Sequence, residues 1–409
     1  MRLLYVVQRY GVRVVGGAET ACRMFAEKLV ERGHEVTVLT SCASSFVSWE
    51  NDLPPGDRTE NGVLVRRVPV IEPRDPVGFA RIHSRVMDSD EVAGISDQRE
   101  WLLAAGPRLR NLAGELRRAS SAADAAVFMT YMYAPTAFGV PLLAGSLPVV
   151  LQPTAHDEPS IRIPHFRSVF FNADALLYLT EEERETVFRV FGSRLPGVVT
   201  GIGIDPVSPS DRVENFRRNH GLGDDPYLVY VGRIDTFKGV AELMRFFVEF
   251  KGRNPSDLRL VLVGDRSMQL PDVADIRYVG FLDEHDRNAA IAGSVALVQP
   301  SPFESFSMVL SEAWMQRRPV LVQGRSDVMV GQCHRSGGGL PYRGFAEFEG
   351  CLGALLGDPG LADELGRNGR EWVTATYGWN SVLDRFEEGV ELASRRFALR
   401  WGAAPTSVR

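Results

Sequence analysis

Residues 227–239 read YLVYVGRIDTFKG, in which a strand pattern runs directly into two cations. Residues 227–231 are apolar and rich in β-branched and aromatic side chains, which predicts a buried strand. Arg233 and Lys238 follow at the carboxyl end of that strand, the edge at which α/β sheets bind ligands. Two fixed cations at such an edge suit a diphosphate, because the guanidinium group of arginine grips phosphate through two hydrogen bonds. The alternative interpretation is a pair of solvated surface charges.

Apolar runs of the same kind recur along the chain and alternate with helical patterns, which predicts βαβ units and parallel sheets. We therefore expect an α/β fold with two Rossmann-like domains, residues 1–205 and 206–378, whose sheets face each other across a ligand-binding cleft. A stretch rich in Gly and Pro at 201–211 marks the boundary. A final helix is predicted over 379–400, and packing of this helix back on the N-terminal domain is one option. The apolar runs are 3–8, 35–40, 63–68, 125–130, 149–154, 175–180, 227–232, 258–264, 276–280, 296–300 and 319–324.

Composition and charge exclude several classes of protein. The chain has 409 residues, with 46 Lys and Arg against 52 Asp and Glu, and a formal net charge of −6. Such a mildly acidic chain is a poor candidate for general nucleic-acid binding, which needs a basic face. Hydrophobic residues make up 44% of the chain, which is typical of globular proteins and excludes a disordered chain. The four cysteines form no CxxC pair and no metal-ligand spacing, so we expect a reducing, cytoplasmic location.

Two stretches raise the question of membrane contact. Residues 125–155 carry no charged side chain and are long enough to span a bilayer, but prolines and glycines interrupt them. A buried strand, a short helix and a second buried strand fit this stretch better. Residues 99–118 carry five arginines and two glutamates, so peripheral contact with the anionic inner face of the membrane competes with a solvated helix as the interpretation.

Two short motifs in the N-terminal half are weaker signals. Gly16-Gly17-Ala18-Glu19 joins the first strand to the first helix, where two glycines let a ligand approach the backbone and the helix amides attract an anion. A tight turn with a glutamate in the first turn of the helix explains the same residues. His156-Asp157 follows the strand pattern at 149–154, which is consistent with a substrate contact, although a lone histidine is more often structural.

A further motif, PSPFESFSM at residues 300–308, leads into a helix that carries Glu312. Glu304 and Glu312 would lie roughly 12 Å apart along an ideal helix axis, with different directions around it. The two carboxylates therefore cannot flank one glycosidic bond, but they can hold two ends of an extended ligand. Amides near residues 306–308 would face a phosphate at the helix N-terminus. Taken alone, the pair is also consistent with a helix cap and a solvated glutamate.

Together the motifs resemble those of the retaining glycosyltransferases of family 4, which have the GT-B fold. They occur in the family's order: the GGxE loop, the HD step, GRxxxxKG over 232–239 and PSxFESFxxxxxEA over 300–313. The resemblance, which runs from Met1 to about Phe386, implies transfer of a hexose from a nucleotide diphosphate sugar, with UDP or GDP as the nucleotide. The acceptor would be a glycan, a lipid or lipid-linked molecule, or a small molecule, as in polysaccharide biosynthesis. It also implies retention of the anomeric configuration, usually without a metal ion or another cofactor.

Matched residue by residue, the resemblance assigns roles on the donor side. Arg233 and Lys238 would hold the diphosphate and support the leaving group. Glu304 would contact the hydroxyls of the donor sugar, and Glu312 would contact the ribose. The backbone contacts to phosphate would come from three successive residues, Ser305, Phe306 and Ser307.

The resemblance also assigns roles in the first domain. Gly16 and Gly17 would let the donor approach that domain, and His156 would lie near the reacting sugar. Asp88-Ser89-Asp90 matches the DxD signature of metal-dependent glycosyltransferases, but no strand precedes it, and we interpret the match as chance.

The chain departs from the family pattern in three places, of which one is the Asn-Gly-Val-Asp step that the family often has before the hinge, where this chain reads TGIGID at 200–205. The family often has glycine where this chain has Ser307, and residues 323–335 match poorly. The base and sugar pockets are therefore less well defined than the phosphate grip. The alternative functions are another GT-B enzyme, such as a sugar nucleotide epimerase, and a non-catalytic two-domain sugar-binding protein.

Overall fold

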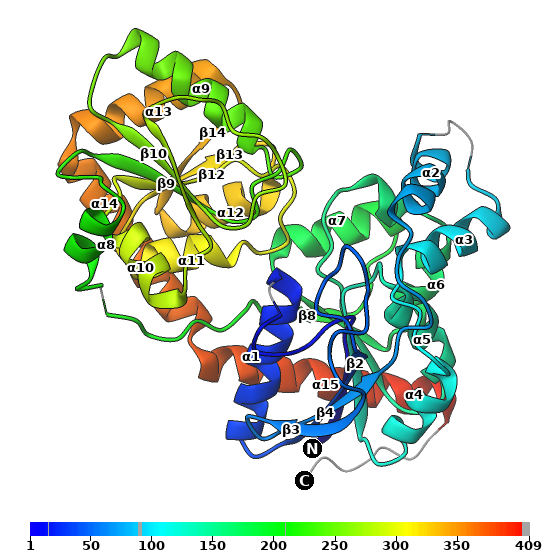
Figure 1. Cartoon of the computed structure of the whole chain (residues 1–409). Coiled ribbons are helices and arrows are strands. Elements are labelled where there is room, and N and C mark those ends of the chain that lie inside the picture. The colour runs from blue at the N-terminus through cyan, green and yellow to red at the C-terminus, as the bar shows by residue number, and fades with distance from the viewer. Residues whose placement is uncertain (15, 89–91, 209, 403–409) are drawn as a thin grey trace. The chain divides into compact units, whose positions relative to one another are not determined.

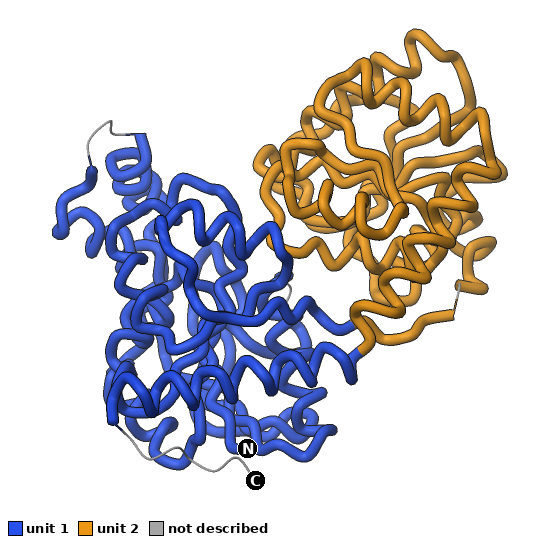
Figure 2. The backbone as a smooth tube through the Cα atoms, turned by 180° about the vertical axis from the view of Figure 1, so that it is seen from behind, with its two compact units in different colours: residues 1–203, 379–409 blue, residues 204–378 orange. Residues whose placement is uncertain are grey.

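In the computed structural model the chain divides into two compact units, each built around one sheet (Figure 2). The structure describes residues 1–14, 16–88, 92–208 and 210–402. Unit 1 comprises residues 1–203 together with the end of the chain from Trp379, and unit 2 comprises residues 204–378. Both units alternate strands with helices around a largely parallel sheet, so the predicted fold class of two α/β domains is confirmed.

The sheet of unit 1 has the strand order β3-β4-β2-β1-β5-β6-β7-β8, and every neighbouring pair is parallel except β3 and β4. Leu3 of β1 pairs with Val36 of β2 on one side and with Ala125 of β5 on the other. The order reverses between β1 and β5, and sheets of this kind bind ligands at such a reversal, outside the carboxyl ends of the strands. The strands are β1 (Arg2–Val6), β2 (Glu35–Ser41), β3 (Gly56–Glu60), β4 (Val63–Val68), β5 (Ala125–Met129), β6 (Val149–Gln152), β7 (Ala175–Tyr178) and β8 (Gly197–Val199).

Helices cover both faces of this sheet, because alternate side chains of its strands are apolar on both sides. Leu4 and Val6 of β1 belong to the large core beneath α2 to α6, whereas Tyr5 points the other way and stacks on Phe386 of α15 at 6.2 Å. Helix α15, which follows unit 2 in the sequence, thus packs on the sheet of unit 1. The helices are α1 (Gly17–Glu31), α2 (Pro76–Met87), α3 (Ile95–Ala105), α4 (Leu112–Ser120), α5 (Ala134–Leu143), α6 (His165–Asn172), α7 (Glu181–Phe191) and α15 (Trp379–Trp401), with a 3-10 turn at Pro159–Arg162.

The two stretches that raised the question of membrane contact are resolved into separate elements. Residues 125–155 form β5, α5 and β6, so the strand, helix and strand predicted there are confirmed. None of the helices in the described part of the chain is long and apolar enough to cross a bilayer. The interpretation of residues 99–118 as one helix is wrong, because Pro107 follows the end of α3 and α4 begins only at Leu112. Arg108 and Arg118 in this stretch pair with Glu72 and Glu115.

The sheet of unit 2 has the order β11-β10-β9-β12-β13-β14, and all neighbouring strands are parallel. Its order reverses between β9 and β12. Helices α9 and α13 cover one face, and α10 and α11 cover the other (Figure 1). The strands are β9 (Tyr227–Val231), β10 (Arg259–Val263), β11 (Ile276–Gly280), β12 (Ala296–Gln299), β13 (Val320–Gln323) and β14 (Gly339–Tyr342). The helices are α8 (Val213–Asn219), α9 (Val240–Arg253), α10 (Glu284–Ala292), α11 (Met308–Met315), α12 (Asp327–Ser336), α13 (Phe345–Gly357) and α14 (Pro359–Tyr377).

Candidate active site

The two cations that follow β9 are organised by a buried carboxylate, Asp235. Its oxygens accept hydrogen bonds from Nε of Arg233 and from the backbone N–H of Lys238, the latter at 2.7 Å. Its side chain is 8% exposed, so it is fixed in place while the two cations keep contact with solvent. The turn ends at Gly239, where φ is 73° and a Cβ atom would lie 2.3 Å from the carbonyl oxygen of Pro300. Only glycine fits there, and it brings the β9 turn against the loop that follows β12.

Lys238 and Glu304 connect the two motifs that flank the reversal of strand order in unit 2. Nζ of Lys238 lies 2.8 Å from Oε1 of Glu304, which precedes α11 as predicted. Burial, helped by the charge of Glu304, raises the pKa of the Tyr230 hydroxyl, which donates a hydrogen bond to the carbonyl oxygen of Arg233 at 2.7 Å. Two cations, Arg233 and Lys238, therefore lie at the same edge of the unit 2 sheet as the Glu304 carboxylate and the N-terminus of α11.

Ser307 caps α11 in a backbone conformation that favours glycine. Its φ and ψ are 64° and 74°, in the left-handed region, and its side chain makes no capping hydrogen bond. Its buried Oγ has no hydrogen-bond partner among the residues that the structure describes. The departure from the family pattern at this position therefore has two structural costs, a strained backbone and an unsatisfied hydroxyl.

Replacing Ser307 by glycine should raise the stability of unit 2 by about 1 kcal/mol, because it removes both costs while adding some flexibility to the unfolded chain. Thermal unfolding of the two proteins, followed by calorimetry, measures the change. An unchanged or lower melting temperature for Ser307→Gly would show that the backbone at this position carries no strain.

Glu312 lies on α11 and is held by an arginine from another helix. Its two oxygens accept hydrogen bonds from Nε and Nη2 of Arg287 in α10, both at 3.1 Å. About a quarter of each side chain is exposed, so the pair remains accessible. No motif surrounds Arg287, so the sequence did not predict its role. The predicted contact of Glu312 with a ribose stays a prediction.

In unit 1, Gly16 makes room for a buried ion pair. Oε1 of Glu19 accepts hydrogen bonds from Nε and Nη2 of Arg9 at 3.0 and 2.6 Å, and from Nε2 of Gln8 at 2.9 Å. A Cβ atom on Gly16 would lie 2.2 Å from Oε2 of Glu19, whereas one on Gly17 would meet nothing within 4 Å. Glu19 therefore forms a buried ion pair and does not act only through the helix dipole. Of the two glycines, Gly17 has open space beside it.

Two threonines at the carboxyl ends of neighbouring strands of unit 1 are strained. Thr130 follows β5 with φ 63°, and Thr154 follows β6 with φ 50°. Left-handed backbone is rare for β-branched residues, and such strain clusters at functional sites. Oγ1 of Thr130 donates a hydrogen bond to Oε1 of Gln8 at 3.0 Å, which links the ends of β1 and β5.

His156 lies in the loop after β6, as its place after the strand pattern predicted. Its Nδ1 is 3.6 Å from Oε1 of Glu158, which also accepts a hydrogen bond from the hydroxyl of Tyr131 at 2.7 Å. The neighbouring Asp157 pairs with Arg162 and Arg189 at the surface. The imidazole is thus partly exposed and lies beside a carboxylate that is itself fixed. Its predicted contact with a sugar stays a prediction.

Glu183 of α7 holds the same loop in place through a hydrogen bond to its backbone. Its oxygens accept hydrogen bonds from the backbone N–H groups of Ala155 and Leu179, both at 2.5 Å, and the side chain is fully buried. Burial raises the pKa of this carboxyl group to about 8, although the backbone hydrogen bonds act in the opposite direction.

Stability should therefore fall with rising pH in a way that depends on Glu183. Between its unfolded pKa of about 4.3 and its folded pKa of about 8, the folded chain keeps a proton that the unfolded chain has lost. Its contribution to the free energy of unfolding should decrease by up to about 1.4 kcal/mol per pH unit in this window and level off above it. Urea unfolding of wild type and Glu183→Gln from pH 5 to pH 8 measures the difference; parallel profiles would contradict the assignment.

The DxD match at residues 88–90, in unit 1, raises the question of a metal site. Within the described ranges, no group of three or more His, Cys, Asp or Glu side chains could hold a metal ion. Of the DxD match, Asp88 follows α2, and Ser89 and Asp90 lie outside the described residues.

Comparison with known families agrees with this geometry. Residues 16–203 match the family model described as glycosyl transferase 4-like domain, and residues 225–333 match the one described as glycosyl transferases group 1. Among curated relatives, D-inositol 3-phosphate glycosyltransferase of Nocardia farcinica is 28% identical over 95% of this chain and 87% of its own length. Glycogen synthase of Mycobacterium tuberculosis is 24% identical over 97% of this chain and 95% of its own.

A solved structure shares the fold at low sequence identity. HepE from Anabaena, in complex with UDP and glucose, superimposes with a TM-score of 0.68 and 14% identity, and the match covers 95% of this chain and 98% of HepE. The two units described above therefore have the architecture of GT-B glycosyltransferases.

Proposed function

Since this chain belongs to the glycosyltransferases with the GT-B fold, we propose that it transfers a hexose from a nucleotide diphosphate sugar, with UDP as the nucleotide, to an acceptor hydroxyl with retention of the anomeric configuration. The structure of HepE with UDP and glucose supports the choice of UDP over GDP. The acceptor is a glycan, a lipid-linked sugar or a small molecule. The proposed reaction needs no metal ion.

The observation that carries this proposal is the edge of unit 2 at the reversal between β9 and β12. Arg233 and Lys238 stand there with Glu304 and with the N-terminus of α11. The cations and the helix amides suit a diphosphate, and the carboxylate of Glu304 suits sugar hydroxyls. In the ligand-free chain Lys238 and Glu304 neutralise each other. A bound donor would offer Lys238 a second anionic partner, its diphosphate, and would offer Glu304 the hydroxyl donors of the sugar.

The residue types fit a reaction in which a diphosphate leaves. The bond between the anomeric carbon and the phosphate oxygen breaks, and negative charge develops on the departing nucleoside diphosphate. Fixed cations stabilise that charge without reorganising. The acceptor oxygen then bonds the anomeric carbon from the same face, and its proton passes to the departing phosphate. A covalent sugar trapped on a protein side chain would contradict this route.

Unit 1 is proposed to supply the acceptor side, with Gly16, Gly17 and His156 in the roles that the family resemblance gives them. Gly17→Ala adds one methyl group where nothing lies within 4 Å, so it should leave the fold unchanged. A lower affinity for UDP in this variant would support the approach of the donor to the glycine loop. His156→Ala should lower the transfer rate with little effect on UDP binding.

The experiment that tests the proposed function combines binding with product analysis. Thermal shifts are measured with UDP, GDP, ADP and TDP, with and without Mg²⁺, because a ligand stabilises the native state in proportion to ln(1 + [L]/Kd). Matching UDP-hexoses are then incubated with candidate acceptors in EDTA, and proton NMR of the product gives its anomeric configuration. We expect UDP to stabilise the protein without metal and the product to keep the donor configuration.

Each alternative outcome excludes part of the proposal. Conversion of the donor to another sugar nucleotide without acceptor would indicate an epimerase. Sugar binding without release of UDP would indicate a binding protein. An inverted product would contradict retention, and loss of activity in EDTA would contradict the metal-free reaction.

A further inference from the structure

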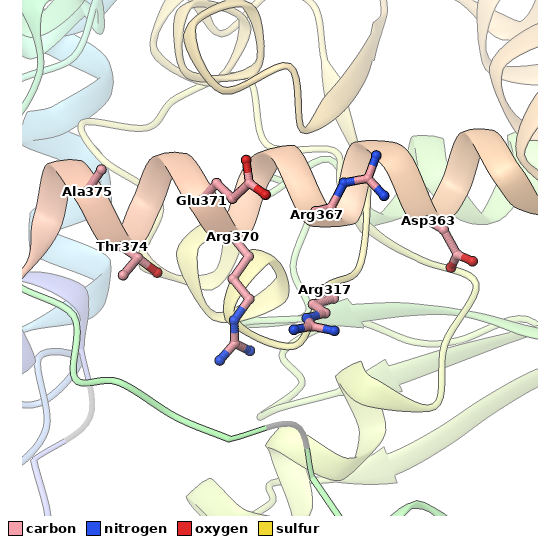
Figure 3. Close-up of a pocket in the computed structure, with 7 residues that line it drawn as sticks. All are labelled: Arg317, Asp363, Arg367, Arg370, Glu371, Thr374 and Ala375. Atoms are coloured by element: carbon pink, nitrogen blue, oxygen red, sulfur yellow. The ribbon is translucent and has the colours of Figure 1, made fainter.

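A second cationic site lies in unit 2, at the edge of the sheet opposite to the candidate active site. Helix α11 begins beside that site, at Met308, and ends at Met315, before β13. Arg317 in the connecting turn and one face of α14 line a pocket of about 740 Å³ (Figure 3). The residues from α14 recur every three or four positions, which places them on one side of the helix. They are Asp363, Arg367, Arg370, Glu371, Thr374 and Ala375.

Arg317 occupies the position just after the end of α11 at which helices usually have glycine. The N–H groups of Arg317 and Arg318 donate to the carbonyl oxygens of Trp314 and Ala313, both at 2.9 Å, which is the Schellman arrangement at the end of α11. The residue at this point needs left-handed backbone, and Arg317 has φ 56°. The turn packs directly against α14, since the Arg317 carbonyl oxygen lies so close to Gly366 that a Cβ atom there would be 2.1 Å away. The turn therefore has no room to move toward α14. The chain therefore keeps an arginine where glycine would be more stable.

The arginines of this pocket are not engaged in ion pairs with described residues, although two acids line the pocket with them. Among the residues that the structure describes, neither Arg317 nor Arg367 forms an ion pair. Arg370 extends from α14 toward Arg317 and donates its hydrogen bonds to backbone carbonyl oxygens, those of Met315 and Val207. Burial and the positive charge of Arg317 lower the pKa of Arg370. Three arginines therefore line this pocket together with two acidic residues, and Arg370 and Arg317 lie on the same side of α14 (Figure 3).

We infer that this pocket binds the phosphate group of a soluble sugar phosphate, at a site separate from that of the nucleotide sugar. Arg317, Arg367 and Arg370 supply planar donors that match a phosphate group. Asp363 and Glu371 also line the pocket, and their carboxylates can accept hydrogen bonds from sugar hydroxyls. These two acids also disfavour a continuous anionic surface such as a membrane. The volume is that of a small-molecule site. This inference does not depend on the proposed transfer reaction.

The test uses the full-length chain and separates the two anion sites by mutation. Ribose 5-phosphate is titrated by calorimetry into Arg233→Ala/Lys238→Ala, in which the grip on the donor diphosphate is removed, and into the same variant with Arg317→Gly added. We expect saturable binding to the first protein and at least about tenfold weaker binding to the second. Because glycine is favoured at φ 56°, Arg317→Gly should keep or raise the melting temperature, so weaker binding cannot be explained by unfolding.

A matched control and a lipid arm complete the test. Arg245→Ala removes another exposed arginine of unit 2, on α9, and should leave the affinity unchanged. Absence of saturable binding, or equal affinity with and without Arg317, would overturn the inference. Binding to phosphatidylglycerol vesicles that ribose 5-phosphate does not displace would also overturn it, because the ligand would then be a lipid surface.

Discussion

Replacing Lys238 by alanine should lower kcat by about 10²–10³-fold while leaving the fold intact. The ammonium group lies at the carboxyl edge of the unit 2 sheet, 2.8 Å from Glu304, where the departing diphosphate of the proposed reaction would gain its charge. A fixed cation acts mainly in the transition state, so kcat should fall more than KM rises. Steady-state release of UDP, measured at saturating donor, gives both constants.

Lys251 provides the matched control for this prediction. It belongs to the same unit and pairs with Asp275 at 3.1 Å, but it reaches the carbonyl oxygen of Leu258 at the amino-terminal edge of the sheet. Lys251→Ala should cost some stability and leave kcat unchanged. If Lys238→Ala keeps wild-type kcat, or if both variants lose activity equally, the assignment of Lys238 to the leaving group is wrong.

The largest loss of stability is expected from Glu19→Ala, at about 3–5 kcal/mol. The side chains of Arg9 and Glu19 are only 5% and 6% exposed, and the substitution leaves the guanidinium group buried without its carboxylate. Hydrogen exchange of the β1 and β5 amides is the appropriate measurement, because it reports on unit 1 alone and does not require the whole chain to unfold in one step.

Two variants decide whether burial causes this loss. Glu31→Ala on the same helix removes the partner of Lys28 in a pair whose glutamate is 64% exposed, and it should cost less than about 1 kcal/mol. Arg9→Met/Glu19→Leu removes both buried charges and should be milder than Glu19→Ala alone. A Glu19→Ala protein as stable as Glu31→Ala would contradict the role of the buried pair.

The sequence predicted the central strands well because they are buried on both faces and read as continuous apolar runs. It missed the strands whose residues carry no such signal. β3 reads GDRTE and lies exposed at the edge of its sheet, and its pairing depends on the turn at Asn61 and Gly62, which both have positive φ. β14 contains Pro341, which argues against a strand in a pattern-based prediction but is tolerated at an edge.

For the candidate site, the sequence could predict the elements that carry each residue but not the partners of that residue. Arg233, Lys238 and Glu304 follow recognisable strands, and parallel strands bring their carboxyl ends to one edge. Asp235 stands between the two cations in the quoted motif, but its role as their common acceptor depends on how the turn closes. The pairing of Glu312 with Arg287 joins two helices without a shared motif, so no local pattern predicts it.

Unit 1 is completed by a helix, α15, that is synthesised after the whole of unit 2. Val382, Phe386 and Val390 of α15 are buried against a sheet formed by the first 203 residues, and the whole of unit 2 is synthesised in between. Until α15 has been synthesised, the nascent first unit therefore presents an uncovered apolar surface, whereas unit 2 is continuous and can close once it has emerged. Although domains usually fold in the order of synthesis, here the second unit is expected to finish folding first, with the first dependent on chaperones meanwhile.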